Sequence, residues 1–341
     1  MEVVARSNRK KRLIILALCL LLLAVCALSV TVGRYPVPLR ELGGMLLSKF
    51  VSIEPFWTST MEKVLFNVRL PRLAMACLVG CALSTAGCAY QGVFQNPMAS
   101  PDILGASKGA AFGAALAILL GAGGAIVMGA AFLSGLLSLA LVLLASARAK
   151  GKRVVNLILA GIIVSSLFEA GTSYIKLVAD PSDTLPSITY WLMGSIAGAT
   201  GRELTFVFWP VLAGSVVLFL LRWQLGILTL GEDEARAMGV NAPAVRMAVL
   251  LCATLLTAVS VSTAGVISWV GLVVPHLARR LVGSNYRYLM PASMVLGSLF
   301  LLVVDGISRN LLLTEIPLGI LTAVVGAPFF LYLMTRGGGE V

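Results

Sequence analysis

Side chains able to do acid, base or metal chemistry are scarce in this sequence. His276 is its one histidine, so neither a histidine metal cluster nor a histidine-based catalytic triad can form within the chain. The glycine-rich loop GxxxxGK[ST], which binds nucleotide phosphates, is absent. We therefore expect no catalytic residue, no metal site and no cofactor, and the sequence shows no energy source of its own.

Glu169 is the main acidic residue inside a predicted apolar span. It either lines a water-filled path or pairs with a neighbouring group, and the sequence leaves both open. A carrier driven by an ion gradient would need several such residues, and only Lys108 accompanies it. The six cysteines all fall in apolar runs, where they are best read as small buried hydrophobes (Cys19, Cys26, Cys77, Cys81, Cys88 and Cys252).

Three polar segments interrupt the apolar pattern. Arg69-Leu70-Pro71-Arg72 lies at the outer mouth of the second predicted span. Gln91–Gly105 contains two prolines and several polar amides, which cannot continue a helix, so we expect a turn on the cytoplasmic side. Leu228–Val240 is typical of a short amphipathic helix on the same side.

This last segment has the features of a capped helix. Its acids lie near the N-terminus, where the helix dipole favours them, and Gly239 lies where a C-cap is expected. We expect Ala235 and Met238 to face outward, so that the helix protrudes and binds a partner. The alternative is a solvated loop.

Composition places these segments in a membrane protein. Of 341 residues, 59% are hydrophobic and 12% are charged, about half the charged share of a soluble domain. The net charge of +11 does not indicate nucleic-acid binding, because the basic residues form short clusters between apolar runs without interleaved aromatics. The fold class expected is all-α and polytopic, in contact with membrane lipid.

Apolar runs predict about ten spans. Met247–Pro275 could be one long helix, but two short spans turning near Gly265 keep the arginines that follow on the inside. The basic N-terminus with Leu13–Val32 resembles a signal peptide, yet the run is long enough to be a retained first helix. The spans expected are 13–32, 73–92, 104–121, 124–145, 154–178, 204–222, 246–263, 265–278, 288–305 and 317–335.

Basic residues set the topology. With both termini in the cytoplasm, most Lys and Arg clusters fall inside, and the basic first outer loop is the exception. Spans two to five and seven to ten then enter from opposite sides, which allows an inverted repeat. Two glycine pairs have the spacing of close helix packing, Gly109 with Gly113 and Gly194 with Gly198.

The motifs together resemble one family, the permease subunits of type II ATP-binding-cassette importers, which carry iron–siderophore complexes, haem, cobalamin and, in some members, molybdate. The resemblance runs through nearly the whole chain, and Met98 in place of the usual Leu is a minor departure. Its matching pieces are Arg69–Arg72, Gln95–Gly105, Trp191–Gly194, Gly231–Gly239, Gly271–His276, Asp305, Arg309, Glu315, Pro317, Gly319 and Gly326–Phe330.

The resemblance implies that residues 1–341 form a single permease domain of the prokaryotic plasma membrane, the inner membrane in a Gram-negative cell. It implies a homodimer with the path along its two-fold axis, two cytoplasmic ATPase subunits and a periplasmic or lipid-anchored substrate-binding protein. Nucleic acid is not an expected partner. The chain itself would not be an enzyme, because ATP hydrolysis would reside in the partner ATPase.

The resemblance also assigns residues. Arg69, Arg72 and Arg309 match outer arginines that receive acidic side chains of the binding protein. The segment matching the ATPase-coupling helices comprises Gly231, Glu232, Asp233, Glu234, Ala235, Arg236, Met238 and Gly239. Residues of the substrate path are not assigned.

Three function classes are weighed on these grounds. An importer permease explains the missing energy source, whereas an ion-coupled secondary carrier or a membrane enzyme needs residues that the sequence lacks. Iron–siderophore or haem is the first cargo expected on family frequency, and cobalamin or molybdate and tungstate are the alternatives.

Overall fold

The computed structural model describes residues 2–33, 35–52, 54–150 and 153–336, and every regular element within these ranges is a helix. Short elements join the long helices at both ends of the molecule. In chain order the elements are α1 (Glu2–Thr31), α2 (Leu39–Leu47), α3 (Ser59–Lys63), η1 (Val64–Arg69), α4 (Leu70–Val93), η2 (Pro101–Leu104), α5 (Ala106–Leu119), α6 (Gly124–Arg148), α7 (Arg153–Val178), α8 (Thr184–Leu192), α9 (Gly201–Leu220), α10 (Arg222–Leu228), α11 (Glu232–Ala237), α12 (Ala242–Ala264), α13 (Val270–Val282), α14 (Tyr286–Asn310) and α15 (Leu318–Arg336).

Helices occupy all ten positions at which the sequence predicts a span. Seven helices of the described ranges are long and apolar enough to cross a membrane by themselves. The helices at the other three positions are shorter: α5 and α15 are apolar over fewer than 18 residues, and α13 has 13 residues. The prediction of an all-α, polytopic membrane protein is confirmed.

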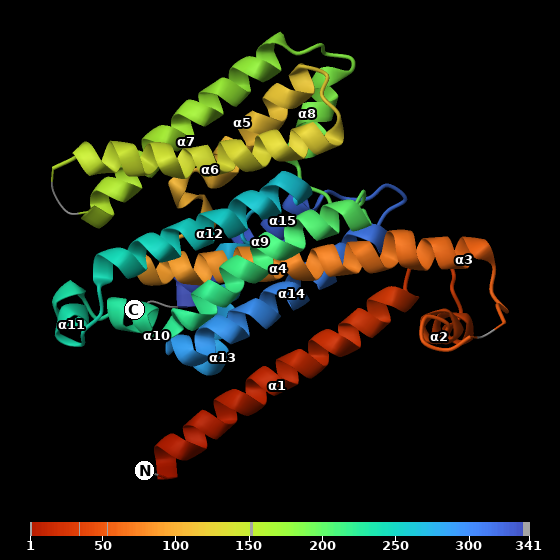
Figure 1. The fold of residues 1–341 in the computed structure, drawn as a ribbon, viewed down its shortest axis with the longest axis horizontal. Coiled ribbons are helices and arrows are strands. Elements are labelled where there is room, and N and C mark those ends of the chain that lie inside the picture. Colours follow the sequence, from red (N-terminus) through yellow and green to blue (C-terminus); the bar gives the residue numbers. More distant parts are fainter. Residues whose placement is uncertain (1, 34, 53, 151–152, 337–341) are drawn as a thin grey trace.

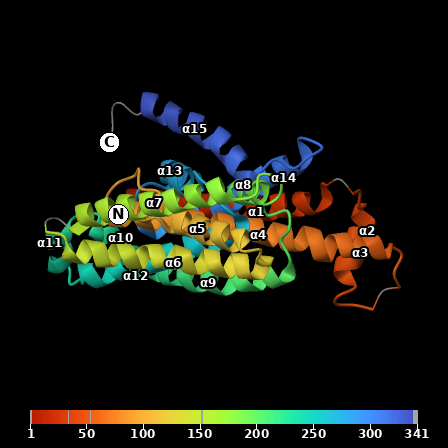
Figure 2. The same ribbon diagram turned by 90° about the horizontal axis from the view of Figure 1, so that it is seen from above.

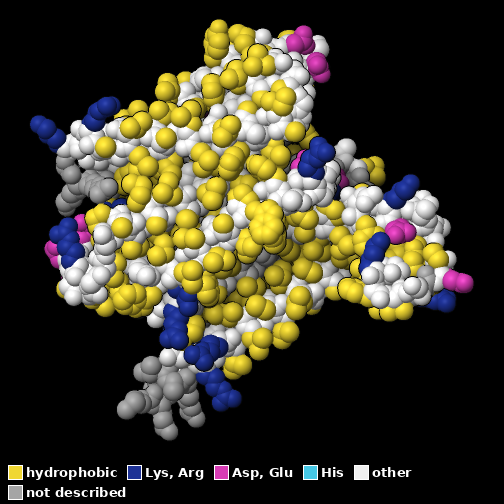
Figure 3. Space-filling view, in the orientation of Figure 1, with side chains coloured by type: hydrophobic (Ala, Val, Ile, Leu, Met, Phe, Trp, Pro, Cys, Tyr) yellow, Lys and Arg dark blue, Asp and Glu magenta, His cyan; other side chains and the backbone are white. Residues whose placement is uncertain are grey.

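The helices run roughly along the long axis of the molecule (Figure 1). α10 and α11 lie at one end, where α1 also begins and toward which α15 returns, while α2 and α3 lie at the other end (Figure 2). Hydrophobic side chains cover the middle of the face shown in Figure 3, and Lys and Arg gather toward both ends. This distribution fits a chain whose middle contacts lipid, so we call the α11 end inner and the α2 end outer.

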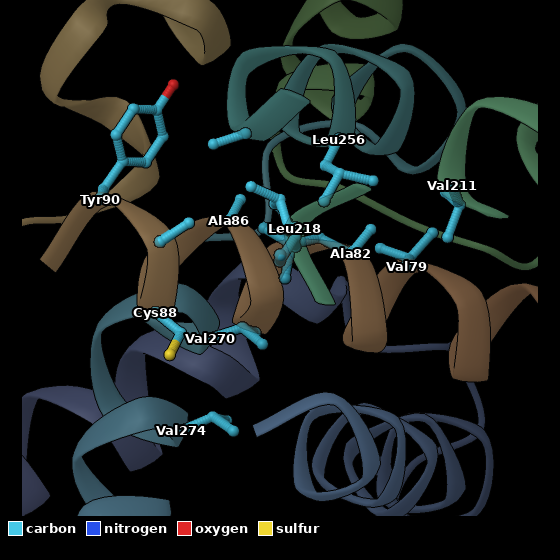
Figure 4. Packing of buried hydrophobic residues seen from close by; sticks show 14 of the residues in the cluster. Val79, Ala82, Ala86, Cys88, Tyr90, Val211, Leu218, Leu256, Val270 and Val274 are labelled. Atoms are coloured by element: carbon cyan, nitrogen blue, oxygen red, sulfur yellow. The ribbon is translucent and has the colours of Figure 1, made fainter. Parts of the chain in front are cut away.

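α4 lies at the centre of the packing, in contact with α9, α12, α13 and α14. Small residues such as Ala82 and Ala86 face Leu218 of α9 and Leu256 of α12, and all four side chains are buried (Figure 4). Small side chains let these helices approach closely, which is the main source of helix association in a membrane. α4 is therefore a fixed frame for the residues at its two ends.

The connection between α4 and α5 is a turn whose second half is buried in the protein. Met98 is half exposed, but Pro101 and Leu104 are buried, and a Cβ at Gly161 in α7 would lie 2.1 Å from the Ile103 carbonyl oxygen. The second half of the segment thus runs inward along α7. A Cβ at Gly161 would clash with this backbone, so the glycine makes room for it. The expected turn is therefore present, since α4 ends at Val93 and the next helical element begins at Pro101, and its cytoplasmic side stays a prediction.

As a result α5 is a partial span. It has 14 residues, about 21 Å of helix, whereas a bilayer core is about 30 Å thick. Its first residue follows Gly105, whose φ of 74° places the backbone in the left-handed region. α5 therefore begins part-way through the molecule beside α7.

The expected division of Met247–Pro275 is confirmed. α12 ends at Ala264, and Gly265 has a φ of 68° that reverses the chain before α13. A side chain at Gly265 would lie 2.4 Å from the Trp191 carbonyl oxygen. The turn is thus locked against the end of α8.

The two glycine pairs differ in outcome. Cβ atoms on Gly109 and Gly113 would lie 2.5 Å and 2.4 Å from carbonyl oxygens of α6, so this pair does bring α5 and α6 together. Gly194 does allow a close approach, because a Cβ there would lie 2.7 Å from the Val266 carbonyl oxygen, but it lies in a turn with a φ of 75° and not in a helix. The prediction was wrong for Gly198, since no atom lies within 4 Å of a Cβ at that position. The spacing alone does not distinguish a helix from the bend that follows one.

Candidate functional site

Arg69 is buried beneath the outer end of α1. Its guanidinium donates hydrogen bonds to the carbonyl oxygens of Val30 and Thr31, in the last turn of that helix, and to that of Tyr35. These carbonyls have no partner within the helix, and a cation there also favours the helix dipole. A Cβ at Gly33 would lie 2.7 Å from the Arg69 Nη2 atom, so glycine makes room for this contact. Arg69 thus ties α1 to the start of α4.

Arg72 lies in the first turn of α4, just after Pro71. Its Nε donates to Asp305 Oδ1 at 2.8 Å, and its two Nη atoms donate to the two oxygens of Glu315, both at 2.9 Å. The fork-to-fork pairing with Glu315 is the geometry in which arginine binds a carboxylate most specifically. Arg72 is 5% exposed and Asp305 is 1% exposed, so both charges are compensated inside the protein.

Arg309 completes the group from α14. Its Nε lies 3.1 Å from Asp305 Oδ2, and its Nη2 donates to Ser29 Oγ at 2.7 Å. Asp305 and Arg309 are four residues apart and so lie on the same helix face. One buried carboxylate therefore bridges two arginines that the chain brings from α4 and α14.

The structure brings all three predicted docking arginines to one place. Arg69, Arg72 and Arg309 line a cavity of 250 Å³ at the outer end, together with Glu315. Three arginines and two carboxylates, Asp305 and Glu315, leave this outer arginine cavity with a net charge of +1, since three minus two is one. The arginines are at most 9% exposed, so an acidic group of a partner would reach them only through the cavity.

At the inner end, α11 is a short helix with a glycine at each side. Gly231 precedes it with a φ of 133°, and Gly239 follows it with a φ of 76°. The N–H of Val240 donates to the Ala235 carbonyl at 2.8 Å, and the N–H of Gly239 donates to that of Arg236 at 3.0 Å. This pattern is the Schellman motif, which satisfies the last carbonyls of a helix. The predicted C-cap is confirmed, and the alternative of a solvated loop is wrong.

One detail of the coupling segment was predicted wrongly. Ala235 is fully buried, in a small cluster that includes Ile227, Leu228 and Val240, so it does not face outward. The Schellman turn brings Val240 back over Ala235, which is why this side of the helix packs inward. Met238 is 52% exposed, as expected, and the outward face also carries Asp233, Glu234 and Arg236.

Arg246, a residue to which the sequence assigned no role in the site, holds the coupling segment in place. It lies in the second turn of α12, its side chain is 6% exposed, and it forms an ion pair with Glu232 of α11. A buried arginine is costly unless paired, so this contact fixes α11 on the inner end of α12. A basic residue one helix later was the available signal, but the sequence could not show that the two helices meet.

Glu169 has a partner inside the span. Its Oε1 lies 3.0 Å from Lys108 Nζ, and both side chains are partly exposed, at 61% and 44%. The reading in which Glu169 pairs with a neighbouring group is confirmed, and its place beside a water-filled path stays a prediction. Among the described residues no group of three His, Cys, Asp or Glu side chains is placed to hold a metal ion.

Comparison with known proteins identifies the family of the chain. The model of the FecCD transport family matches residues 20–336, nearly the whole chain. The chain belongs to the FecCD transport family. Among relatives of the family, a molybdate import permease of Haemophilus influenzae is 40% identical over 328 residues, covering 95% of this chain and 97% of that one. A probable iron chelatin permease of Helicobacter pylori is 35% identical over 281 residues, covering 82% of this chain and 85% of that one.

A solved structure supports the same assignment of fold. It is described as an inward-facing conformation of a metal-chelate type ATP-binding-cassette transporter, and it superposes with a TM-score of 0.84 at 39% identity. The match covers 95% of this chain and 99% of that one. As a FecCD permease, the chain is a multi-pass subunit of an ATP-binding-cassette importer in the plasma membrane.

Proposed function

We propose that this FecCD permease forms, as a homodimer, the membrane path of an importer for a metal-containing cargo, with residues 1–341 as one permease domain. A binding protein delivers the cargo at the outer end, and two ATPase subunits bind at the inner end. The observation that carries this proposal is the pairing of a basic cavity at one end with a capped, acid-rich helix at the other.

The energy comes from the partner ATPase in this proposal. The permease has no phosphate-binding loop, and the ion pair that joins α5 to α7, Lys108 with Glu169, is already neutralised. α11 would sit in a groove of the ATPase, with Met238 as its apolar contact and Glu234 and Arg236 as polar contacts. The ion pair of Glu232 with Arg246 would transmit the motion of this helix to α12.

Docking of the binding protein is proposed at the outer arginine cavity. Acidic side chains of that protein would compete with Glu315 for Arg72, because Glu315 is the more exposed of the two carboxylates, at 28%. Such charge pairs set orientation and association rate more than affinity, and salt weakens them. Arg69 and Arg309 would then hold the cavity in shape as well as add positive charge.

For the cargo, both groups of candidates have a relative. The 40% identity to a molybdate permease over nearly the full length supports molybdate or tungstate as the first cargo to test. An iron–siderophore complex or haem, expected first from family frequency, is supported by the iron chelatin permease at 35% identity. Cobalamin is the next alternative.

Copurification tests the assembly directly. The tagged permease, extracted in mild detergent, should bring down an ATPase subunit in a one-to-one ratio and elute as a dimer of permeases. The binding protein from the same cells should then bind this complex in a salt-dependent manner. Isolation as a monomer that retains no ATPase at any detergent or salt condition would overturn the proposal.

A further inference from the structure

A patch of basic side chains lies at the inner end of α1 and is distinct from the coupling segment. It is formed by two distant stretches of the chain, the basic run of α1 and the end of α13 with the start of α14. Lys and Arg side chains gather there, beside the N-terminus, in Figure 3. We call this group the inner basic patch, and its members are Arg9, Lys10, Lys11, Arg12, Arg280 and Arg287.

Tyr288 of α14 brings the two stretches together. The centroid of its ring lies 5.6 Å from Lys11 Nζ and 5.9 Å from Arg287 Cζ, and both distances are in the range of a cation–π contact. A Cβ at Gly283, in the turn between α13 and α14, would lie 3.6 Å from Lys11 Nζ. The basic run of α1 is therefore packed over this turn, and α1 contacts both α13 and α14.

No acidic side chain among the described residues balances these cations. The helices that pack against α13 and α14 near the patch, α4, α10 and α15, contain no Asp or Glu, and neither does α13. Asp305 of α14 belongs to the outer arginine cavity. None of the six cations forms an ion pair with a described carboxylate, so the inner basic patch has a charge of +6.

Topology alone does not account for this arrangement. The tendency of Lys and Arg to stay in the cytoplasm explains the side of the membrane on which each cation lies. It does not require cations of α1 and α14 to meet at one ring, where their mutual repulsion costs free energy. Negative charge from outside the chain would remove that cost.

The inner basic patch lies at the level of the lipid headgroups. The apolar part of α1 begins at Leu13, directly after Arg12, so the basic run occupies the turn at the inner edge of the hydrocarbon core. Leu13 and Leu16 are each 55% exposed, and Leu281, next to Arg280, is 46% exposed. Cations with exposed apolar side chains beside them fit a phospholipid, which carries a phosphate and acyl chains in one molecule.

α1 has little attachment to the bundle along its length. In its most apolar stretch 11% of the residues are buried. The hydrogen bonds from Arg69 to the Val30 carbonyl and from Arg309 to Ser29 hold its outer end. The inner end is therefore the end at which a bound lipid would add most to the attachment of α1.

We infer that the inner basic patch binds the phosphate groups of anionic phospholipids in the inner leaflet, and that this lipid holds the inner end of α1 on α13 and α14. Lys11 and Arg287, both placed by the Tyr288 ring, are the central contacts, and the other four cations add to the attraction. The inference follows from the membrane location of the chain and is independent of the proposed cargo.

Native mass spectrometry of the detergent-solubilised permease tests this inference. The protein is mixed with equal amounts of phosphatidylglycerol, which is anionic, and phosphatidylcholine, which is zwitterionic, and each bound lipid is measured. The patch variant combines Lys11→Gln with Arg287→Gln. The matched control combines Arg148→Gln with Lys150→Gln, which removes two exposed charges from the end of α6 and the loop after it.

We expect the wild type to bind phosphatidylglycerol in preference to phosphatidylcholine. Because one cation near an anionic lipid surface changes binding about fivefold, the affinity for phosphatidylglycerol should fall about 25-fold in the patch variant and much less in the control. Phosphatidylglycerol should also raise the thermal unfolding midpoint of the wild type more than that of the patch variant. Excess inorganic phosphate should not displace the lipid, because it has no acyl chains to contact the exposed leucines.

Four results would overturn the inference. The first is equal binding of the two lipids by the wild type, and the second is an equal loss of affinity in the patch and control variants, which would show a general effect of charge. Displacement of phosphatidylglycerol by inorganic phosphate would show a site for a soluble anion instead. Loss of ATPase binding by the patch variant, with its affinity for phosphatidylglycerol unchanged, would assign the patch to the ATPase.

Discussion

Arg72 and Glu315, 243 positions apart in the sequence, join through two parallel hydrogen bonds of 2.9 Å at the outer end of the molecule. Glu315 lies in the short connection between α14 and α15, so the pair fixes that connection to the start of α4. Because Glu315 is partly exposed, it is also the carboxylate that an incoming acidic partner would meet first.

Removal of this carboxylate should speed docking. Glu315→Gln raises the net charge of the outer arginine cavity from +1 to +2 and frees part of the Arg72 fork. We expect the association rate with the binding protein to rise about two- to tenfold at low ionic strength, with the gain lost at high salt. Stopped-flow fluorescence measures this rate.

Glu62→Gln is the matched control, because Glu62 lies in α3 at the outer end in an exposed pair with Lys49. It makes the same change of charge away from the cavity, so it should have a smaller effect. Equal effects of the two variants, or slower docking of Glu315→Gln, would contradict docking at the cavity.

Asp305 should matter more for stability than for docking. Asp305→Ala leaves Arg72 and Arg309 without the carboxylate that bridges them, and an uncompensated buried charge costs about 3–5 kcal/mol. We expect a clear fall in the thermal unfolding midpoint of the detergent-solubilised protein. Glu62→Gln should shift the midpoint little, because exposed ion pairs contribute about 0–1 kcal/mol. A midpoint as high as that of the wild type would show that the bridge is not needed.

The sequence predicted the positions of the ten helices that correspond to spans, because long apolar runs have one favourable solution in a bilayer, but it did not predict short helices such as α2 and α8. It also predicted the cap at Gly239 and the turn at Gly265, which depend on local residues. It did not predict that Ala235 faces inward, since that follows from packing against α10. The course of residues 101–105 likewise depends on the groove at Gly161, a contact that sequence spacing cannot reveal.

The same distinction applies to the candidate site residues: their face was predictable from the sequence, and their partners were not. Arg69, Arg72 and Arg309 were expected at one face, and they do line one cavity. Their partners are backbone carbonyls of α1, Ser29, Asp305 and Glu315, which come from separate parts of the chain. Only the folded structure shows that the arginines stabilise the outer end as well as give it a positive charge.

Two substitutions at the inner end distinguish a residue that contacts the ATPase from a residue that holds α11 on α12. Met238→Ala removes an exposed apolar side chain from the end of α11, and we expect the ATPase to bind about tenfold more weakly while the permease keeps its thermal stability. Arg246→Met breaks the buried pair with Glu232, so α11 should loosen on α12. ATP hydrolysis should then continue without cargo transport.

Two quantities are measured: the affinity of the permease for the ATPase, and the amount of cargo transported per ATP hydrolysed. Leu230→Ala is the control for Met238→Ala, since Leu230 is also exposed and lies just before the coupling segment. Normal coupling in Arg246→Met would refute the role of the ion pair as the link between α11 and α12.

The approach of α5 to α6 sets up a matched pair of glycine substitutions. A Cβ at Gly113 would lie 2.4 Å from the Ala130 carbonyl oxygen, so Gly113→Ala should destabilise the protein by about 1–3 kcal/mol. A Cβ at Gly129, in α6, would have no atom within 4 Å, so Gly129→Ala should be neutral or slightly stabilising. Thermal unfolding of both variants checks this, and a neutral Gly113→Ala would show that the two helices can separate at no cost.

The most direct test of the account is the source of energy for transport. Proteoliposomes containing the permease alone should accumulate no cargo under any proton or sodium gradient, and should hydrolyse no ATP. Addition of the ATPase and the binding protein, with ATP on the side of the membrane where the ATPase lies, should start uptake of a metal-containing cargo. Cargo accumulation by the permease alone, driven by an ion gradient, would contradict the account and make the chain a secondary carrier.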